Sequence, residues 1–492
     1  MLEGFLKSAT AHPAHPAIRI GGQTYSYSEL LRMASAVSHA LNDHPADSHY
    51  VGLYTDNTIH TYAALLGILM AGKAFVPLNH KFPDERLEKM IADAEIKQAA
   101  CCSGSETRLK SIHPQLQFIF SDQLQTENVF APVSADGNSD AYILYTSGST
   151  GVPKGIPVTR NNFSALLGAL RKRFTIQPED RVLQAFELSF DVSLACVFFA
   201  WEFGATLVVA DLDGITAVNA FKAVYEEKAT FVTLPPSALY YLKRLRLIGS
   251  VQLPFVHTTL FTGEALPYKV VEEWKTSAPQ TAVENAYGPT ETTVWSLFYK
   301  LEEDAADQLV NGLCPIGEGL DGIAVRIVDE KGKDVAGGER GELWVSGPQI
   351  FHGYRNNEAK TKEVLTTDAG GNSWYKTGDI VLKNAKGNIV YINRKDNQVQ
   401  VNGYRVELGE VEHALRKASG IDGAVVLATE KNQVTELYGF LEGKFEKEEV
   451  LSRMRTLVPG YMVPRDLVAV NPLPVNTNGK VDKQLLKKTY LA

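Results

Sequence analysis

The chain has 492 residues, of which 45% are hydrophobic and 22% charged, with 39 Gly and 22 Pro spread along it. This composition excludes a disordered, collagenous or coiled-coil protein and indicates a globular chain with a sizeable core. Lys and Arg number 49 against 57 Asp and Glu, a net charge of −8, so we expect no nucleic-acid partner held by bulk electrostatics.

The sequence carries no signal for a membrane or for secretion. Its longest apolar runs, at 62–72 and 194–201, are shorter than the ~20 residues that cross a bilayer. The N-terminus lacks the basic start and the long apolar core of a secretory signal. We therefore expect a cytoplasmic protein without a membrane span, whose four cysteines are free thiols.

Up to about residue 390, short apolar runs typical of strands alternate with segments of helical period. Residues 50–54, 60–71 and 74–78 give one strand, helix and strand in succession. Residues 141–145 precede a Gly/Ser/Thr loop and a helical face over 163–174. This rhythm predicts layered, mainly parallel sheets covered by helices, with the loop joining a strand directly to a helix.

After Gly312 the pattern changes to short strands separated by Gly-rich turns, which predicts a small β-rich subdomain. Beyond it we expect a small α+β module with helices 407–418 and 447–457 and strands 423–428, 437–442 and 467–470. The overall prediction is an α/β fold with an N-terminal core domain, residues 1–394, and a mobile C-terminal domain, residues 397–492.

The sharpest local signal is the tract 145–155, with the sequence YTSGSTGVPKG. Its backbone N–H groups and hydroxyls could donate to phosphate oxygens, with Lys154 as a point charge. The tract is not a Walker loop, because Lys154 follows Pro153 and precedes Gly155. Taken alone, a flexible surface loop explains it equally well.

Two further places could bind the rest of a nucleotide. In the segment 285–293, NAYGPTETT, Tyr287 could stack on a planar base and Glu291 could hold a divalent cation. Farther on, Asp379 and Arg394 could reach ribose hydroxyls. Each of these taken singly is as often an ordinary turn or a solvated charge.

Asp191 and Lys480 each allow a simple and a functional interpretation. Asp191 begins an apolar helix and could be its N-cap; alternatively, it is a buried carboxylate that faces a ligand ammonium, because an unpaired buried charge is costly. Lys480 lies on a Gly turn and could be merely exposed. The histidines do not cluster, and we find neither a metal-ligand set nor a Ser/His/Asp arrangement.

Taken in order, these segments resemble the adenylate-forming superfamily, in particular the amino-acid adenylation domains of nonribosomal peptide synthesis and their stand-alone relatives. The match covers nearly the whole chain and includes 24–30, 69–78, 341–347, 403–410 and 459–464. The resemblance implies that ATP and a carboxylic acid give an acyl-adenylate and pyrophosphate, after which the acyl group moves to a thiol. Because the carboxylate itself attacks the α-phosphate, no protein nucleophile is required.

The resemblance also implies roles for individual residues. The ATP-binding set would be Thr146, Ser147, Gly148, Ser149, Thr150, Gly151, Lys154, Asn285, Ala286, Tyr287, Gly288, Thr290, Asp379, Arg394 and Lys480. Tyr287 would stack on adenine, Asp379 and Arg394 would hold the ribose, and Glu291 would bind Mg²⁺. Thr146, Lys154 and Lys480 would be catalytic, with Lys480 bridging the acyl carboxylate and the α-phosphate. Asp396 would be the hinge about which the small domain rotates to present 403–405 for thioester formation.

Amino-acid-activating members of the superfamily carry an Asp at position 191, which pairs with the α-ammonium. The other substrate-binding positions would be Val192, Ala195, Ser237, Leu260, Thr262, Ala286, Val294, Trp295 and Lys480. Apart from Lys480, which faces the carboxylate, none is charged, and a charged side chain would enter unpaired at a cost of several kcal/mol. We therefore expect a neutral amino acid as substrate.

Alternatives remain open. The segment 259–267 and Ser149 are especially similar to D-alanine–carrier-protein ligases of teichoic acid D-alanylation, whereas 396–405 is closer to the peptide-synthetase type. An acyl-CoA ligase and a catalytically inactive ligand-binding relative are further possibilities. Gln400 stands where many members have lysine, which puts any thioester-stage role of that lysine in doubt. No phosphopantetheine attachment motif follows Lys480, so we expect the carrier protein to be a separate chain, unless this chain is an excised piece of a larger synthetase.

Overall fold

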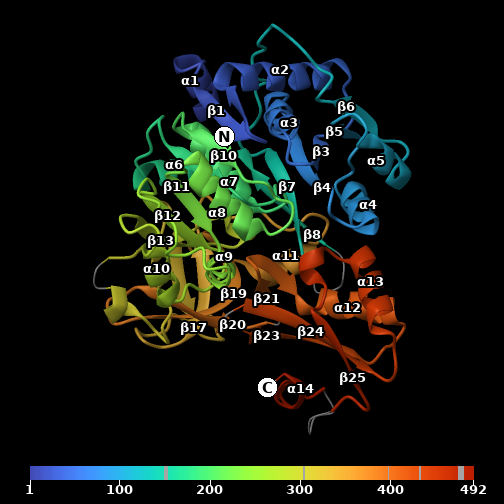
Figure 1. Ribbon diagram of the computed structural model, residues 1–492, viewed down its shortest axis with the longest axis vertical. Helices are drawn as coiled ribbons and strands as arrows, with labels where there is room; N and C mark the ends of the chain where they lie inside the picture. The colour runs from blue at the N-terminus through green and yellow to red at the C-terminus, as the bar shows by residue number, and fades with distance from the viewer. Residues whose placement is uncertain (149–152, 303–304, 397, 432–433, 475–480, 492) are drawn as a thin grey trace.

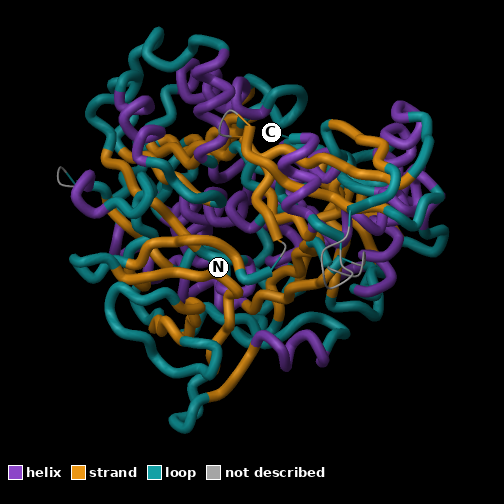
Figure 2. Tube along the Cα trace, turned by 90° about the horizontal axis from the view of Figure 1, so that it is seen from below, coloured by secondary structure: helices purple, strands orange, loops and turns teal. Residues whose placement is uncertain are grey.

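The computed structural model describes residues 1–148, 153–302, 305–396, 398–431, 434–474 and 481–491. Figure 1 shows the first two thirds of the chain, blue to yellow, above the orange and red C-terminal elements. Helices flank the strands on more than one side (Figure 2). The predicted α/β class, with layered sheets and a small C-terminal α+β region, is confirmed.

The first sheet has six strands in the order β6-β5-β3-β4-β7-β8. Its pairs are parallel except for β7 and β8. The strands are β3 (Tyr50–Thr55), β4 (Ala74–Asn79), β5 (Gln98–Cys101), β6 (Gln117–Phe120), β7 (Asp140–Thr146) and β8 (Lys154–Thr159). The helices between them are α3 (Ile59–Met70), α4 (Asp84–Asp93) and α5 (Glu106–Ile112). Helix α3 is apolar all round and almost wholly buried, as expected for a helix without a solvent face.

The second sheet has nine strands in the order β15-β14-β13-β12-β11-β9-β10-β1-β2, with a parallel centre from β13 to β1. The strands are β1 (Pro16–Ile20), β2 (Gln23–Ser26), β9 (Arg181–Gln184), β10 (Thr206–Val209), β11 (Phe231–Leu234), β12 (Thr258–Thr262), β13 (Ala282–Tyr287), β14 (Leu297–Lys300) and β15 (Glu318–Gly319). The associated helices are α1 (Glu3–Ala11), α2 (Tyr27–Asp43), α6 (Arg160–Arg173), α7 (Asp191–Glu202), α8 (Thr216–Glu227), α9 (Pro236–Arg244) and α10 (Tyr268–Lys275).

The predicted β-rich subdomain is a five-stranded sheet of mainly antiparallel pairs. It contains β16 (Ala324–Val328), β17 (Gly341–Ser346), β18 (Leu365–Thr367), β19 (Ser373–Lys383) and β20 (Ile389–Arg394), with helix α11 (Glu358–Val364). Its longest strand, β19, carries the 375–379 motif and pairs with both β17 and β20.

The C-terminal part contains the hairpin β21 (Gln398–Val401) and β22 (Tyr404–Glu407), the sheet β23 (Ala424–Lys431), β24 (Val434–Glu442) and β25 (Asp466–Val470), and the helices α12 (Leu408–Ser419), α13 (Lys447–Leu457) and α14 (Lys483–Tyr490). It has its own hydrophobic clusters. The five elements expected from the sequence are present within a few residues. The hairpin and α14 were not anticipated.

One local prediction is wrong. The 145–155 loop does not lead directly into a helix, because β8 lies between the loop and α6 and pairs antiparallel with β7. The β-branched Ile156 and Val158 alternate with less apolar neighbours and are buried, which favours a short strand. The loop is therefore the turn of a hairpin, with Thr146 opposite Lys154.

Two expectations about the whole chain can be compared with the structure. Over the part that the structure describes, no helix is both long and apolar enough to reach across a bilayer. The four cysteines are free, and three of them are buried.

Candidate active site

Asp191 is the first residue of α7, and the N-cap position belongs to Phe190, which makes no side-chain capping bond. The simple interpretation of Asp191 as the helix N-cap is therefore wrong. The Thr290 side chain and the Val192 backbone favour the charged form of its carboxylate, while Oδ2 is buried without a partner among the residues that the structure describes. Burial nevertheless raises the pKa of Asp191 to about 6, because these groups and the charge of Arg405 only partly offset it.

Most of the uncharged positions expected around a substrate side chain are buried in the core, where Thr262 of β12 pairs with Ala286 of β13. Ala195, Leu260, Ala286, Val294 and Trp295 belong to one buried hydrophobic cluster, and Val192 packs against it. Trp295 is 2% exposed, and its indole Nε1 donates to Thr262 Oγ1 at 3.0 Å. This hydrogen bond fixes the orientation of the indole beside β12.

Backbone strain accompanies the placement of Trp295. The two preceding residues, Thr293 and Val294, have φ values of 56° and 66°, which β-branched side chains rarely adopt. Hydrogen bonds hold this turn: Thr293 donates to the Gln349 carbonyl at 2.6 Å, and the Gln349 amide donates to the Trp295 carbonyl at 2.8 Å. A Cβ on Gly288 would lie 2.3 Å from the Val294 carbonyl oxygen, so this close approach requires glycine.

The predicted base- and ribose-binding residues lie together. The Tyr287 hydroxyl donates to Asp379 Oδ2, and Arg394 Nη1 contacts Asp379 Oδ1 at 2.7 Å. Burial raises the pKa of Asp379 despite the opposing charge of Arg394. Arg394 also contacts Asp396 at 2.8 and 2.7 Å. Asn285, by contrast, donates its side-chain amide to the Pro315 carbonyl and holds the strand end in place.

Glu291, the candidate Mg²⁺ ligand, is fully buried. Tyr354 donates to Oε1 at 2.7 Å and Arg405 Nη1 contacts Oε2 at 2.9 Å. Burial alone would raise the pKa of Glu291, but Arg405, Lys154 and the Tyr354 hydrogen bond outweigh it and lower the pKa to about 2. This carboxylate is charged, and both its oxygens are taken in this arrangement.

The residues around Glu291 fit a Mg²⁺ ion that is held by one protein carboxylate together with phosphates and water. Across the described ranges, no group of three or more His, Cys, Asp or Glu side chains could hold a metal. Mg²⁺ is commonly bound by one or two carboxylates together with substrate phosphates and water. Glu291 could serve as that carboxylate once Arg405 has withdrawn from Oε2.

Residues of the predicted phosphate loop contact the C-terminal part of the chain. Ser147 Oγ accepts from the Glu407 N–H at 3.1 Å, and the Gly148 N–H donates to Glu410 Oε2 at 2.9 Å. Lys154 Nζ lies 3.3 Å from Glu407 Oε1, and burial lowers the pKa of this lysine. Ser149, Thr150, Gly151 and Lys480 lie outside the described residues.

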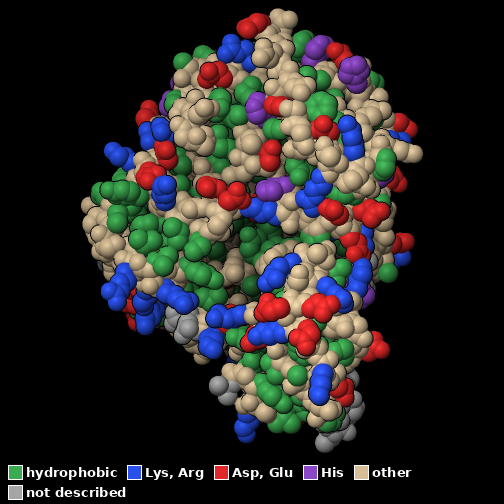
Figure 3. Space-filling model, turned by 45° about the vertical axis from the view of Figure 1, so that its right-hand side comes forward, with side chains coloured by type: hydrophobic (Ala, Val, Ile, Leu, Met, Phe, Trp, Pro, Cys, Tyr) green, Lys and Arg blue, Asp and Glu red, His purple; other side chains and the backbone are tan. Residues whose placement is uncertain are grey.

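Aromatic rings join the hairpin β21–β22 to the start of α7. Tyr404 stacks on Tyr461 with ring centroids 4.2 Å apart, and Phe190 meets Tyr404 edge-on at 4.4 Å. The Gly403 N–H donates to Glu264 Oε1 at 2.6 Å, while Glu264 Oε2 accepts from the Ser237 N–H. The 403–405 segment thus lies at the candidate site. Figure 3 shows a hollow between the upper body and the lower part, with charged side chains gathered along its lower rim.

Sequence reasoning missed the contacts of five residues in this site: Arg86, Tyr354, Arg405, Glu407 and Glu410. The last three lie inside a segment that the resemblance includes, and two acidic residues near a helix start were a usable signal. Arg86 and Tyr354 carried no local signal, because their partners are far away in the sequence.

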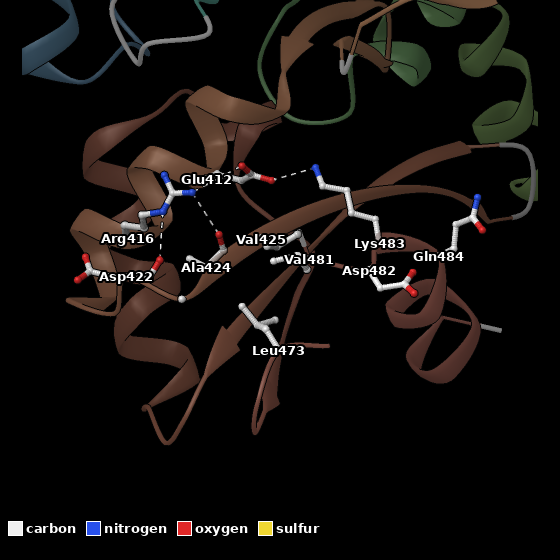
Figure 4. Close-up of a pocket in the computed structure, with 11 residues that line it drawn as sticks. Glu412, Arg416, Asp422, Ala424, Val425, Leu473, Val481, Asp482, Lys483 and Gln484 are labelled. Atoms are coloured by element: carbon white, nitrogen blue, oxygen red, sulfur yellow. Dashed lines mark hydrogen bonds and ion pairs between the residues drawn. The ribbon is translucent and has the colours of Figure 1, made fainter. Parts of the chain in front are cut away.

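A second cavity lies wholly within the C-terminal part and contains none of the described candidate residues. Figure 4 shows Lys483 of α14 pointing toward Glu412 of α12, at 3.3 Å, and Arg416 beside the carbonyls of Asp422 and Ala424. The ion pair ties the start of α14 to α12.

The family model for AMP-binding enzymes matches residues 5–355. The chain belongs to the AMP-binding enzyme family. Its members are AMP-forming adenylating ligases, and this chain is an adenylation domain of the nonribosomal peptide synthetase type. The predicted family and enzyme class are confirmed.

Relatives among well-characterised proteins are large synthetases. A plipastatin synthase of Bacillus subtilis (strain 168) is 30% identical over 492 residues, which cover 98% of this chain and 19% of that protein. Tyrocidine synthase 3 of Brevibacillus parabrevis is 30% identical over 497 residues, covering 98% of this chain and 7% of that protein. The AMP-binding chain thus spans a fifth or less of these relatives.

Solved structures give the same fold. An NRPS protein containing adenylation and PCP domains, bound to a vinylsulfonamide inhibitor, has a TM-score of 0.85 at 26% identity, with 99% of this chain and 84% of that chain covered. The Vibrio cholerae adenylation domain AlmE in complex with glycyl-adenosine-5'-phosphate has a TM-score of 0.89 at 23% identity, with 100% and 97% covered. At this identity, the second likeness supports the fold alone.

Proposed function

We propose that this protein activates a neutral amino acid with ATP as aminoacyl-AMP and transfers the aminoacyl group to the phosphopantetheine thiol of a separate carrier protein. The observation that carries the proposal is the buried Oδ2 of Asp191, which has no partner in the described part of the chain. A substrate ammonium supplies the missing cation, and fatty or aryl acids do not.

In the proposed geometry, the carboxylate of the amino acid lies next to the groups that bind the phosphates of ATP. Asp191 and Glu291 lie close enough for the charge of Glu291 to act on the pKa of Asp191. An ammonium on Asp191 therefore places the substrate carboxylate near the phosphate-binding groups Ser147, Gly148 and Lys154. Holding that carboxylate in line with the α-phosphate and neutralising the developing charge are the main catalytic tasks.

The remaining roles are proposed as the sequence suggested them. Tyr287 stacks on adenine, Asp379 and Arg394 hold the ribose, and Lys480 bridges the carboxylate and the α-phosphate. Each oxygen of Asp379 has one protein donor and retains a second lone pair for a ribose hydroxyl. A Mg²⁺ ion bound through Glu291 would neutralise phosphate charge.

The second half-reaction is proposed to use the observed arrangement of the C-terminal part. Residues 403–405 lie beside Phe190 and Glu264, next to the proposed amino-acid pocket. Rotation about Asp396 would exchange this arrangement for one that brings Lys480 to the site. After thiol attack on the aminoacyl-AMP carbonyl, the C–S bond replaces the C–O bond and AMP leaves.

The indole of Trp295 favours a small side chain on the substrate, because its bond to Thr262 fixes it across the pocket. Because D-alanine is itself a small neutral amino acid, the same experiment also tests the D-alanine ligase alternative. The substrate of an acyl-CoA ligase needs no ammonium, so this alternative does not explain the carboxylate of Asp191.

ATP–pyrophosphate exchange against L- and D-amino acids, glycine, and aryl and fatty acids tests the proposal. We expect one small neutral amino acid to exceed the others, and Asp191→Ala to abolish its exchange. D-alanine as the best substrate would favour the D-alanine ligase alternative. A preference for acids without an amino group would overturn the proposal.

A further inference from the structure

Charged side chains from residues 405–410 contact core groups to which the proposed function assigns Mg²⁺ and the phosphates of ATP. A cation lies where the metal would be held, and anions lie where phosphates would be held. The contacts are Arg405 with Glu291, Glu407 with Lys154, and Glu410 with the Gly148 N–H, at 2.9, 3.3 and 2.9 Å. The C-terminal segment thus has the charge pattern of magnesium polyphosphate.

Arg86 is the core cation that neither a motif nor the proposed mechanism has used. Its Nη1 lies 2.9 Å from Glu410 Oε1, while the Gly148 N–H holds Oε2 of the same carboxylate. The side chains of Arg86 and Glu410 are both 5% exposed. One carboxylate therefore bridges a buried guanidinium and a phosphate-loop amide.

Two contacts with the core also hold Arg86 in place. Its guanidinium lies 5.1 Å from the centroid of the Phe82 ring, and Nη2 is 3.5 Å from the Tyr145 carbonyl oxygen. Its Nε is buried with no acceptor in the ranges that the structure describes. If the module swings away, the core contacts keep Arg86 in place, and its guanidinium lacks the Glu410 carboxylate.

Guanidinium and loop N–H groups bind phosphate oxygens as they bind carboxylate oxygens. We propose that Arg86 and the Gly148 amide form an exchange site, in which the Glu410 carboxylate and the terminal phosphates of Mg·ATP bind alternately. The inference rests on the proposed use of ATP. Arg86 is then a nucleotide-binding residue, and Glu410 is its internal competitor.

This exchange couples the binding of the nucleotide to the position of the C-terminal module. Mg·ATP cannot occupy Gly148, Lys154 and Glu291 while residues 405–410 hold them, and pyrophosphate must leave before the segment docks again. The nucleotide thereby selects the arrangement of the module through charge competition.

Direct binding of Mg²⁺ with α,β-methylene-ATP, an analogue that cannot form an adenylate, tests the inference by calorimetry. Glu410→Gln removes the competitor and should tighten binding by about 5-fold, whereas Arg86→Ala removes the phosphate contact and should weaken it by about 10-fold. Lys417→Ala is the matched control, because it breaks an exposed pair with Glu85 between the same helices, α12 and α4. We expect it to leave binding unchanged.

The inference requires Glu410→Gln and Arg86→Ala to change the affinity for the analogue in opposite directions. If Arg86 only clasps the module, Arg86→Ala should tighten binding as Glu410→Gln does, and the inference is overturned. Equal affinity in all variants overturns it too. Arg86→Lys, which keeps the charge, guards against misfolding of the alanine variant and should bind between wild type and Arg86→Ala. A wild-type protein that binds no analogue would instead remove the proposed use of ATP and this inference with it.

Discussion

The carboxylate of Glu291 is paired with the guanidinium of Arg405 at 2.9 Å, although the two residues are 114 positions apart. Glu291 follows β13 in the nine-stranded sheet, and Arg405 belongs to the hairpin β21–β22. The pair therefore links the core to the C-terminal part at the centre of the site.

Replacement of Arg405 should show how much the Arg405–Glu291 pair contributes to the stability of the protein. Arg405→Ala leaves Glu291 as a buried carboxylate with a reduced set of partners, at a cost of about 3–5 kcal/mol. We expect a lower Tm, and a larger Tm increase on addition of Mg²⁺ and α,β-methylene-ATP than in wild type. Lys447→Ala, which breaks a half-exposed pair with Asp466 in the same part of the chain, should cost less than about 1 kcal/mol. Equal melting shifts for both variants would contradict the prediction.

Replacement of Asp191 should stabilise the folded protein and impair its activity. At pH 8, Asp191→Asn removes a half-buried charge whose folded-state pKa is raised, and should stabilise the free protein by on the order of 2–3 kcal/mol. It should also lower amino-acid-dependent pyrophosphate exchange by about 100-fold or more, because the ammonium loses its partner. Urea titration and exchange measure the two effects. Asp321→Asn, at an exposed ion pair with Lys172, serves as the control and should change neither.

The stabilising effect of Asp191→Asn should depend on pH. The raised folded-state pKa, about 6, means that the folded protein keeps this proton where the unfolded chain has lost it. Wild-type stability therefore increases as pH falls through 6, and the advantage of Asp191→Asn shrinks toward pH 4. An advantage that does not change between pH 8 and pH 4 would contradict the raised pKa.

Substrate affinity should show the same titration. Below pH 6 the Asp191 carboxyl becomes neutral and ceases to pair with the ammonium, so KM for the amino acid should rise about 10-fold for each pH unit. Asp191→Asn is the comparison, because position 191 then no longer titrates and its KM for the amino acid should not follow this pH dependence. A KM for the amino acid that stays flat from pH 8 to pH 5 would count against the role of Asp191.

Trp295 should limit the size of the substrate. Trp295→Ala opens the pocket and should shift the preferred amino acid to a larger neutral one, at a stability cost of about 3–5 kcal/mol. Thr262→Ser retains an acceptor for the indole N–H and should keep the original preference. Pyrophosphate exchange over the amino-acid panel compares the two variants. An unchanged preference in Trp295→Ala would remove Trp295 from the pocket wall.

Local signals in the sequence predicted the elements with strong periodicity. The helix expected at 447–457 is α13 to the residue, because its buried Val450, Leu451 and Met454 share one face. The strand β8 was missed because six residues of mixed polarity, including a proline, give a weak strand signal. Tertiary contacts such as Arg86–Glu410, 324 positions apart, depend on how the modules pack and have no local signature.

The candidate site was predictable to the extent that its residues lie in motifs. The Tyr287–Asp379–Arg394 contacts bring together three segments that were each ambiguous alone. The pocket positions came from the resemblance and not from composition. Their closure by the Trp295–Thr262 bond required the strained backbone at Thr293 and Val294, which no sequence pattern indicated.

The register of β7 and β8 also bears on how the phosphate loop can vary. Thr146 and Lys154 are directly paired across the hairpin, so their separation is set by the sheet and not by the residues between them. The entropic cost of closing a flexible loop grows only slowly with its length. Insertions or deletions between these two residues should therefore be tolerated thermodynamically, while the hydroxyl and the ammonium keep their spacing. In this chain, the hairpin sets the backbone positions of Thr146 and Lys154 independently of the residues between them.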